Sequence, residues 1–287
     1  TYLLEFKYMN NLLKFNVLVK AIKYFNRTKT DLTAPIYIEE VNDYVKRIVL
    51  NNPRRRNSLS FAYMTELENQ LLKFENLNNI RVLIIKSSSN TFSSGHDLLE
   101  FDKSNSSDHK KVFDKASNLM KIIENYFIPV IVSIQGTAAA AGCQLVASCD
   151  IAICGQSSLF STPGILAGLF CSTPGVAVGR VLPRKIALEM LYTGEPISAE
   201  TALKYGLVNH VVEDSKIDET SEKIANKIAS LSSSTMKLGK KCFIEQMKLE
   251  KEKAYELASN VMVENLQFTD CKEGIKAFLE KRKPRWN

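Results

Sequence analysis

The chain of 287 residues carries a formal net charge of +7, and 45% of its residues are apolar, a composition typical of one large globular domain or of two. Six basic residues lie within the first thirty positions and others at 281–283, so the middle of the chain is nearly balanced, which argues against a nucleic-acid-binding groove. No apolar run is long enough to span a bilayer, and six cysteines without a C-x-x-C pair indicate neither a disulfide framework nor a metal site.

Residues 1–34 differ in composition from the rest of the chain. They carry six basic and two acidic side chains, with apolar residues interleaved at amphipathic spacing. This pattern is typical of a mitochondrial transit peptide, although the small number of arginines and serines leaves an unrelated extension as the alternative. We therefore expect an import signal at 1–34, a folded core at 35–213 and a helical region at 214–287.

Between residues 36 and 86 the pattern changes from strand to helix and back. Apolar residues alternate from Ile36 and again from Val45, with a polar turn between them, which predicts a β-hairpin. Ser60 is placed to cap the helix whose apolar stripe follows, and R-V-L-I-I-K at 81–86 predicts a buried strand. The Gly-centred turn T-F-S-S-G-H-D-L comes next, at the end of a strand, where α/β folds place their ligands.

The stretch 128–150, I-P-V-I-V-S-I-Q-G-T-A-A-A-A-G-C-Q-L-V-A-S-C-D, follows a helix predicted at 108–126. It opens with a β-branched run typical of a strand buried on both faces and continues through four alanines and a glycine into an apolar helix. Small side chains leave the first N–H groups of that helix accessible, and these groups have no partner within the helix. The positive end of the helix suits a developing oxyanion. Close packing of the helix on the strand selects the same small residues and is an equal alternative.

The remaining pattern predicts three more strands and then helices alone. A Gly- and Pro-rich loop, S-T-P-G-I-L-A-G-L-F-C-S-T-P-G, has a length that is usually functional. Strands that alternate with helices early in the chain predict an α/β fold. The strands are expected at 150–154, 157–160 and 207–212, and the helices at 184–192, 197–206, 215–231, 233–246, 249–268 and 271–282.

Five motifs together resemble the crotonase (enoyl-CoA hydratase/isomerase) superfamily, from residue 36 to the C-terminus. They are N-P-R-R-R-N-S-L-S, F-S-S-G-H-D-L, the stretch P-V-I-V-S-I-Q-G-T-A-A-A-A-G-C-Q-L-V-A-S-C-D, G-E-P-I-S-A-E-T-A-L-K-Y-G-L-V-N-H-V-V, and E-G-I-K-A-F-L-E-K-R-K-P. The resemblance implies an α/β fold, a ClpP-like spiral of ββα units, with a C-terminal helical region that mediates trimerisation. It further implies binding of fatty acyl-CoA thioesters in the mitochondrial matrix, by a homotrimer or a dimer of trimers, with coenzyme A as part of the substrate and no other cofactor.

The resemblance also implies which residues form the site. The family's oxyanion hole consists of two backbone N–H groups, which fall on His96 and Ala141. The basic side chain of Arg55 makes chemical sense against the phosphates of CoA, with a solvated charged surface as the alternative. The other residues implied in the CoA groove are Asn57, Ser58, Leu59, Ser94, Gly95, Asp97 and Leu98, with Phe278 and Lys281 at its adenine and phosphate end, contributed by the same or a neighbouring subunit.

Two positions depart from the pattern of the family's hydratases. These enzymes use two glutamates to add water across the double bond, and the matching positions here hold Gln144 and Gly164. A glutamine amide can position a water but cannot take its proton, and glycine can do neither, so the general acid–base contribution, typically ~10²- to 10⁴-fold for each group, is lost. We expect at most feeble hydration, and we expect that restoring both glutamates would raise it.

Three functions remain open at this point. The first is an enoyl-CoA hydratase-like lyase with altered catalytic residues. The second is a decarboxylase of malonyl-type thioesters that uses only the oxyanion hole and His96, because that reaction needs enolate stabilisation and no base. The third is a non-catalytic protein that binds CoA esters. Cys171 is a further nucleophile candidate, with packing as the alternative.

Overall fold

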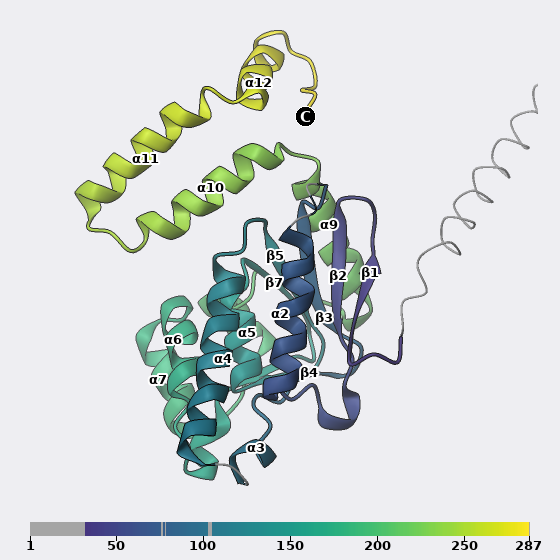
Figure 1. The fold of residues 1–287 in the computed structure, drawn as a ribbon, viewed down its shortest axis with the longest axis vertical. Coiled ribbons are helices and arrows are strands. Elements are labelled where there is room, and N and C mark those ends of the chain that lie inside the picture. Colours follow the sequence, from purple (N-terminus) through teal and green to yellow (C-terminus); the bar gives the residue numbers. More distant parts are fainter. Residues whose placement is uncertain (1–31, 76, 78, 103–104, 287) are drawn as a thin grey trace, which may run out of the picture.

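The structure, a computed structural model, describes residues 32–75, 77, 79–102 and 105–286. Two β-sheets and the helices around them form the body of the molecule, and three helices extend from one end of it (Figure 1). The expected import signal lies almost wholly outside the described residues. No helix in the described part of the chain is both long and apolar enough to cross a membrane.

The larger sheet has six strands in the order β1-β2-β3-β5-β7-β10. β1 and β2 form the predicted antiparallel hairpin, and all the other neighbours are parallel. Its central strands are buried on both faces, as their β-branched composition predicts. The strands are β1 (Ile36–Glu40), β2 (Val45–Leu50), β3 (Val82–Ser87), β5 (Val130–Ile134), β7 (Ile151–Gly155) and β10 (His210–Val212).

The smaller sheet has four short strands in the order β4-β6-β8-β9. A strand of the larger sheet leads three times into a strand of the smaller sheet and then into a helix: β3-β4-α4, β5-β6-α5 and β7-β8-α6. This repeat confirms the predicted spiral of ββα units. The strands are β4 (Thr91–Ser93), β6 (Thr137–Ala139), β8 (Leu159–Ser161) and β9 (Ile197–Ser198).

Helices cover both faces of the larger sheet. Against one face pack α2 (Phe61–Glu75), α4 (Ser106–Glu124) and α5 (Ala141–Ser148), which share the main apolar core with β3 and β5. The opposite face is covered by α9 (Ile217–Ala229). The predicted cap of α2 is confirmed, since the Ser60 hydroxyl accepts a hydrogen bond from the Tyr63 N–H at 3.2 Å.

The Gly- and Pro-rich segment predicted as one long loop is instead largely helical. It contains the short helix η2 (Pro163–Ala167) and the start of α6 (Ser172–Val181). Both elements carry a proline in the first turn, where its missing N–H has no intrahelical partner and its fixed φ is compatible with a helix. Proline here therefore starts helices. The other short helices are η1 (Pro53–Arg55), α3 (Leu99–Asp102), α7 (Arg184–Thr193), α8 (Ala199–Tyr205) and η3 (Asp214–Lys216).

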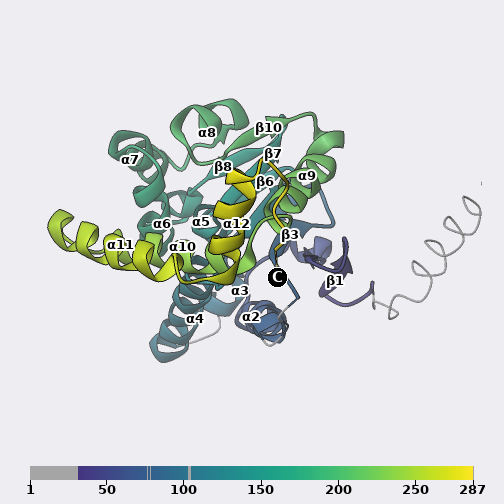
Figure 2. The same cartoon turned by 90° about the horizontal axis from the view of Figure 1, so that it is seen from above.

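The C-terminal region consists of α10 (Ser233–Gln246), α11 (Lys251–Asn265) and α12 (Thr269–Leu279). These helices extend from the end of the sheets opposite α3, and from above they cross over the body of the molecule (Figures 1 and 2). No residue of α10 or α11 is buried. The Lys240 ammonium ties α10 to the core by donating to the Asp150 carboxylate at 2.6 Å and to the Ile128 carbonyl at 3.1 Å.

Candidate functional site

A pocket of about 420 Å³ lies between the end of β4, the start of α5 and the segment that begins at Pro163. We call it the acyl pocket. Most of its wall is apolar, and no Asp, Glu, Lys or Arg occurs among the described residues that line it. The lining residues are Ser94, His96, Leu98, Phe113, Ala140, Pro163, Gly164, Ala167, Leu169, Phe170, Cys171, Ser172, Thr173 and Pro174.

The start of α5 presents N–H groups beside the acyl pocket. The first bond of the helix runs from the Gln144 N–H to the Ala140 carbonyl at 3.0 Å, so the N–H of Ala141 has no acceptor within the helix. Ala140, which caps the helix and lines the pocket, has φ 50° and ψ −118°, a conformation costly for any residue but glycine. Strain of this kind, of order 1–3 kcal/mol, typically persists at functional sites.

The turn after β4 brings His96 close to the start of α5. Gly95 has φ +87°, and a β-carbon built on it would lie 2.7 Å from the Ala140 β-carbon and 3.2 Å from the Ala141 nitrogen. The Leu59 N–H donates to the Gly95 carbonyl at 2.7 Å in a parallel bridge between Leu59 and His96. In such a bridge the His96 N–H points away from Leu59. The structure therefore brings together the two peptide groups that the resemblance implied for the oxyanion hole.

The His96 imidazole packs among aromatic side chains rather than against solvent. Its centroid lies 5.8 Å from that of Phe101 and 5.4 Å from that of Phe113, both edge-on. Nδ1 lies 3.4 Å from the Leu59 carbonyl oxygen, which can only accept, so this long hydrogen bond favours the tautomer protonated at Nδ1. Burial lowers the pKa of His96, which keeps the ring neutral. Nε2 is buried without a protein partner among the described residues.

Gln144 lies on the first turn of α5 and is only 4% exposed. Because the Cα–Cβ bonds of a helix tilt toward its N-terminus, this side chain extends over the turn that begins at Ala140. Its amide oxygen is buried and has no partner in the described part of the chain. The residue at the first glutamate position is thus uncharged and lies one turn along the helix whose start borders the pocket.

Gly164 lies in the wall of the acyl pocket, but the space beside it is filled. A β-carbon built on it would overlap the Leu169 carbonyl oxygen and would lie 2.8 Å from the Cys171 sulfur. The Leu169 N–H donates to the Gly164 carbonyl at 2.9 Å, which closes this segment on itself. A glutamate at this position would therefore clash with backbone, which opposes the expected gain in hydration from restoring both glutamates.

The side chains of Asn57 and Leu59 are directed into the protein, not toward a groove. The Asn57 amide donates to the Ser87 hydroxyl at 2.9 Å and to the Phe92 carbonyl at 3.1 Å, and it is fully buried. Leu59 belongs to the main core, and Ser58 is 8% exposed. None of these three residues lines the acyl pocket, and Leu59 supports the segment that carries His96 through its backbone bridge.

Arg55 and Asp97 form an ion pair of 2.6 Å on the surface near the pocket. The second carboxylate oxygen of Asp97 accepts a hydrogen bond from the Leu99 N–H at 3.2 Å, a turn-forming role. Arg55 remains 47% exposed, so it is accessible to an anion that displaces Asp97. Leu98 is 60% exposed at the pocket mouth, whereas Ser94 lines the interior and donates its N–H to the Arg56 carbonyl at 3.0 Å.

Phe278 and Lys281 lie far from the acyl pocket of the same chain, at the end of α12 (Figure 1). Phe278 is 83% exposed. In this conformation the two residues therefore do not reach the CoA groove of their own subunit. Approach from a neighbouring subunit stays a prediction.

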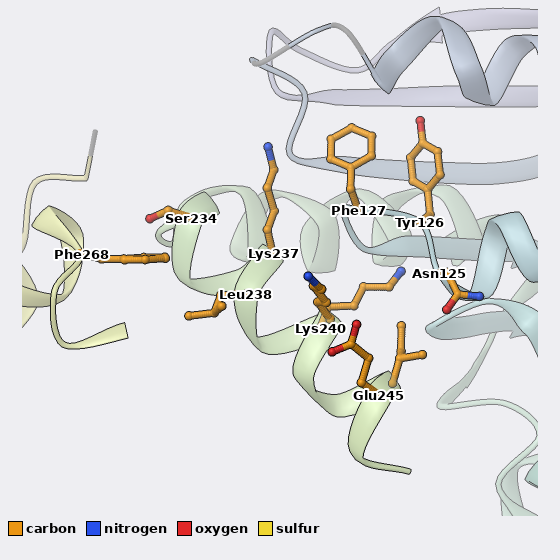
Figure 3. Close-up of a pocket in the computed structure, with 11 residues that line it drawn as sticks. Asn125, Tyr126, Phe127, Ser234, Lys237, Leu238, Lys240, Glu245 and Phe268 are labelled. Atoms are coloured by element: carbon orange, nitrogen blue, oxygen red, sulfur yellow. The ribbon is translucent and has the colours of Figure 1, made fainter. Parts of the chain in front are cut away.

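A second hollow, of about 560 Å³, lies between α10 and the Asn125–Phe127 turn (Figure 3). Lys237 extends toward Phe127, with Nζ 5.0 Å from the ring centroid, and the Phe268 ring faces α10. Its described lining includes the charged side chains of Lys237, Lys240, Lys241 and Glu245, which do not suit an apolar ligand. Chemistry rather than size therefore identifies the acyl pocket as the candidate site. In the described residues no group of His, Cys, Asp or Glu side chains is arranged to hold a metal ion.

The sequence reasoning missed several residues of the acyl pocket. Phe113 belongs to the helix predicted at 108–126, and its side chain forms a wall of the pocket and contacts the His96 ring. Leu169 and Phe170 were part of an unassigned loop. Their apolar character within a Gly- and Pro-rich segment was the only signal available.

Comparisons with known proteins identify the class of protein to which this fold and site belong. The family model "Enoyl-CoA hydratase/isomerase" matches residues 40–287. Mitochondrial enoyl-CoA hydratase domain-containing protein 3 of Homo sapiens is 50% identical over 246 residues, covering 85% of this chain and 81% of that protein. The protein of the same name from Xenopus laevis is 45% identical over 273 residues, covering 95% and 93%.

Solved structures agree with the sequence relatives. The crystal structure of human enoyl-CoA hydratase domain-containing protein 3 superimposes with a TM-score of 0.86 at 48% identity, covering 88% of this chain and all of that one. An enoyl-CoA hydratase from Mycobacterium smegmatis gives the same TM-score at 37% identity. The chain belongs to the enoyl-CoA hydratase/isomerase family and has the crotonase fold.

Proposed function

We propose that this protein binds thioesters of coenzyme A with uncharged, apolar acyl groups. The observation that carries the proposal is the pairing of two backbone N–H groups, on His96 and Ala141, with an acyl pocket that no charged side chain lines. Two such donors suit a thioester oxygen, and an apolar wall suits a fatty acyl chain. The Arg55 guanidinium beside this turn suits the phosphates of CoA.

Hydration of an enoyl thioester by this site is expected to be feeble. Gln144 cannot accept a proton from water, and Gly164 has no side chain. The oxyanion donors remain, and one such donor is typically worth ~10²- to 10³-fold in rate. The protein therefore acts as a hydratase-like lyase with altered catalytic residues, or as a binder of CoA esters without turnover.

The decarboxylase alternative is less well supported. A malonyl-type acyl group carries a carboxylate into the pocket, and no Lys or Arg is among the described residues that line it. Transfer of an unpaired carboxylate into an apolar environment is strongly unfavourable. The neutral His96 ring does not supply the missing positive charge.

We also propose that the protein acts in lipid metabolism of the mitochondrial matrix, since its relatives are named mitochondrial. Residues 1–34 would serve as the import signal. Fusing them to a fluorescent protein and imaging cells tests this directly. Diffuse cytosolic fluorescence, or an intact N-terminus in protein recovered from mitochondria, would contradict it.

The exposed apolar side chains of the C-terminal helices support assembly into a homotrimer or a dimer of trimers. Sedimentation velocity at several concentrations distinguishes monomer, trimer and hexamer, and a monomer at all concentrations would contradict this part of the proposal. The side chains concerned are Phe243, Met247, Tyr255, Met262, Val263, Ile275, Phe278 and Leu279, each between 48% and 83% exposed.

The test of the binding proposal is isothermal calorimetry with butyryl-CoA and with malonyl-CoA. We expect butyryl-CoA to bind and malonyl-CoA to bind at least about ten-fold more weakly, because transfer of the malonyl carboxylate into the apolar pocket is unfavourable. A ten-fold difference in affinity corresponds to about 1.4 kcal/mol of binding free energy. Absence of butyryl-CoA binding by protein that is folded by circular dichroism would overturn the proposed function. Tighter binding of malonyl-CoA would favour the decarboxylase.

A further inference from the structure

One lining residue of the acyl pocket carries a nucleophile. Cys171 caps α6 and is 7% exposed, and its sulfur lies 2.8 Å from the position of a β-carbon on Gly164. The sulfur therefore lies in contact with the point where a side chain at position 164 would begin. The resemblance puts the second glutamate of the hydratases at that position, so a thiol lies beside the position that carries this glutamate in those enzymes.

A separate observation indicates that a polar ligand belongs beside this pocket. The Gln144 amide oxygen is buried without a partner among the described residues, and the side chain extends back over the turn that begins at Ala140, which lines the pocket. An unsatisfied buried acceptor of this kind destabilises the protein without its ligand. A ligand donor, or a water that accompanies the ligand, would remove that destabilisation.

We propose that Cys171 adds covalently to α,β-unsaturated acyl thioesters held in the acyl pocket. The inference rests on the proposed function, because the thioester must first bind. The Cys171 sulfur forms a bond to the β-carbon, the π electrons of the double bond move into an enolate, and the α-carbon takes up a proton. The thiol hydrogen is thus replaced by carbon, the product is a saturated thioether adduct, and no group leaves and no redox partner is needed.

The pocket activates the electrophile more than the thiol. The N–H groups of His96 and Ala141 are placed to stabilise the enolate oxygen as it forms. Burial raises the pKa of the Cys171 thiol, opposed by a hydrogen bond from the Gly164 backbone, so the group is mostly protonated at neutral pH and the addition is slow. No carboxylate among the described lining residues can activate a water. We therefore expect the thiol, rather than water, to attack the β-carbon.

The experiment uses the full chain, with crotonyl-CoA as the electrophile and butyryl-CoA as a ligand that binds but cannot be attacked. After acid quenching, intact-protein mass spectrometry should show one added thioester mass, which peptide mapping should place on Cys171. Cys242, partly buried on α10 and outside the acyl pocket, provides the comparison within the same molecule. We expect Cys171 to react at least about ten-fold faster than Cys242, since each oxyanion donor is typically worth ~10²-fold or more.

Two cysteine variants test where the adduct forms. Cys171→Ser should abolish the adduct, and its affinity for butyryl-CoA is measured in parallel so that labelling is compared at equal occupancy of the pocket. Cys242→Ser, outside the pocket, should change neither the adduct nor butyryl-CoA binding. Excess butyryl-CoA should slow the labelling of wild type in proportion to its occupancy of the pocket. If butyryl-CoA binds and crotonyl-CoA leaves Cys171 unmodified, or modifies it no faster than Cys242, the inference is overturned and the proposed function stands. If butyryl-CoA itself does not bind, the proposed function fails first.

Discussion

Gly95 and Ala140 are in contact so close that a β-carbon on Gly95 would lie 2.7 Å from that of Ala140. This contact joins the turn that carries His96 to the start of the helix that carries Ala141. It explains why the turn needs a glycine, beyond its φ of +87°. The separation of the two N–H groups proposed as oxyanion donors depends on this contact.

Gly95→Ala is therefore expected to weaken both the fold and ligand binding. Gly206 has nearly the same φ, +86°, but no neighbouring atom within 4 Å of its β-carbon position, so Gly206→Ala is a matched control. We expect Gly206→Ala to cost about 1 kcal/mol of unfolding free energy and Gly95→Ala roughly 1–3 kcal/mol more. Urea denaturation and calorimetry with butyryl-CoA measure the two effects. Equal stability and equal affinity in the two variants would show that the contact has no role.

Gly164→Ala tests whether the backbone contact closes this part of the pocket wall. The added methyl group would meet the Leu169 carbonyl, so we expect a clear fall in melting temperature. Gly179→Ala, within α6 and with open space around its β-carbon position, should leave stability unchanged or raise it by up to about 1 kcal/mol. By the same reasoning the double variant Gln144→Glu, Gly164→Glu should fail to fold properly. A well-folded double variant by circular dichroism would contradict this view of the wall.

The Lys240–Asp150 ion pair should make the docking of α10 depend on pH. Burial raises the pKa of Asp150, and Lys240 opposes that rise. Because the carboxylate is partly exposed, we expect Lys240→Met to cost roughly 1–3 kcal/mol at pH 7. The cost should shrink as pH falls through the raised pKa of Asp150, since the protonated acid no longer needs its partner. Melting temperatures of wild type and variant at pH 4 and pH 7 give the comparison, and a loss that is the same at both would be evidence against this pairing.

His96 should contribute to acid sensitivity through its buried ring. Burial lowers its pKa below the ordinary value of 6.5, so the native state holds the neutral form. A pKa that is lower in the folded than in the unfolded state adds to the unfolding free energy in full at pH values above the unfolded-state pKa, about 6.5. This contribution is lost as the pH falls from about 6.5 toward the folded-state pKa. The variant His96→Leu keeps the backbone N–H and should lose less unfolding free energy than wild type between pH 7 and pH 5. An identical loss in both proteins would show that the ring is not buried in its neutral form.

The periodic parts of the sequence predicted most of the fold. The buried run Val130–Ile134 and the amphipathic helices after Glu213 needed only local patterns, and both were correct. The short strand β6 and the helix α6 were missed, since three residues cannot show a period and since prolines in a first turn resemble loop residues. Elements of this kind depend on neighbours that are distant in the chain.

The residues of the candidate site also differ in whether local sequence could predict their place. His96 and Ala141 could be selected from motifs, because each backbone donor follows from a local turn or helix start. The packing of Leu169 and Cys171 against Gly164 could not, since a glycine in a sequence does not reveal what occupies the space beside it. The same holds for Asn57, whose place in the motif suggested a ligand contact and whose amide instead donates to the Ser87 hydroxyl and to the carbonyls of Thr91 and Phe92.

The proposed function requires that the backbone N–H groups of His96 and Ala141 hold a thioester oxygen. Isothermal calorimetry with wild-type protein and two ligands tests it most directly: butyryl-CoA, and its S-butyl thioether, which keeps the chain and the CoA portion and lacks the carbonyl. Two hydrogen bonds of roughly 0.5–1.5 kcal/mol each predict that the thioester binds about ten-fold more tightly. Ala141→Pro removes one of the two donors at a helix position that accepts proline. In protein shown to be folded, this variant should reduce the difference in affinity between the thioester and the thioether. Equal affinity of wild type for the two ligands would contradict the account.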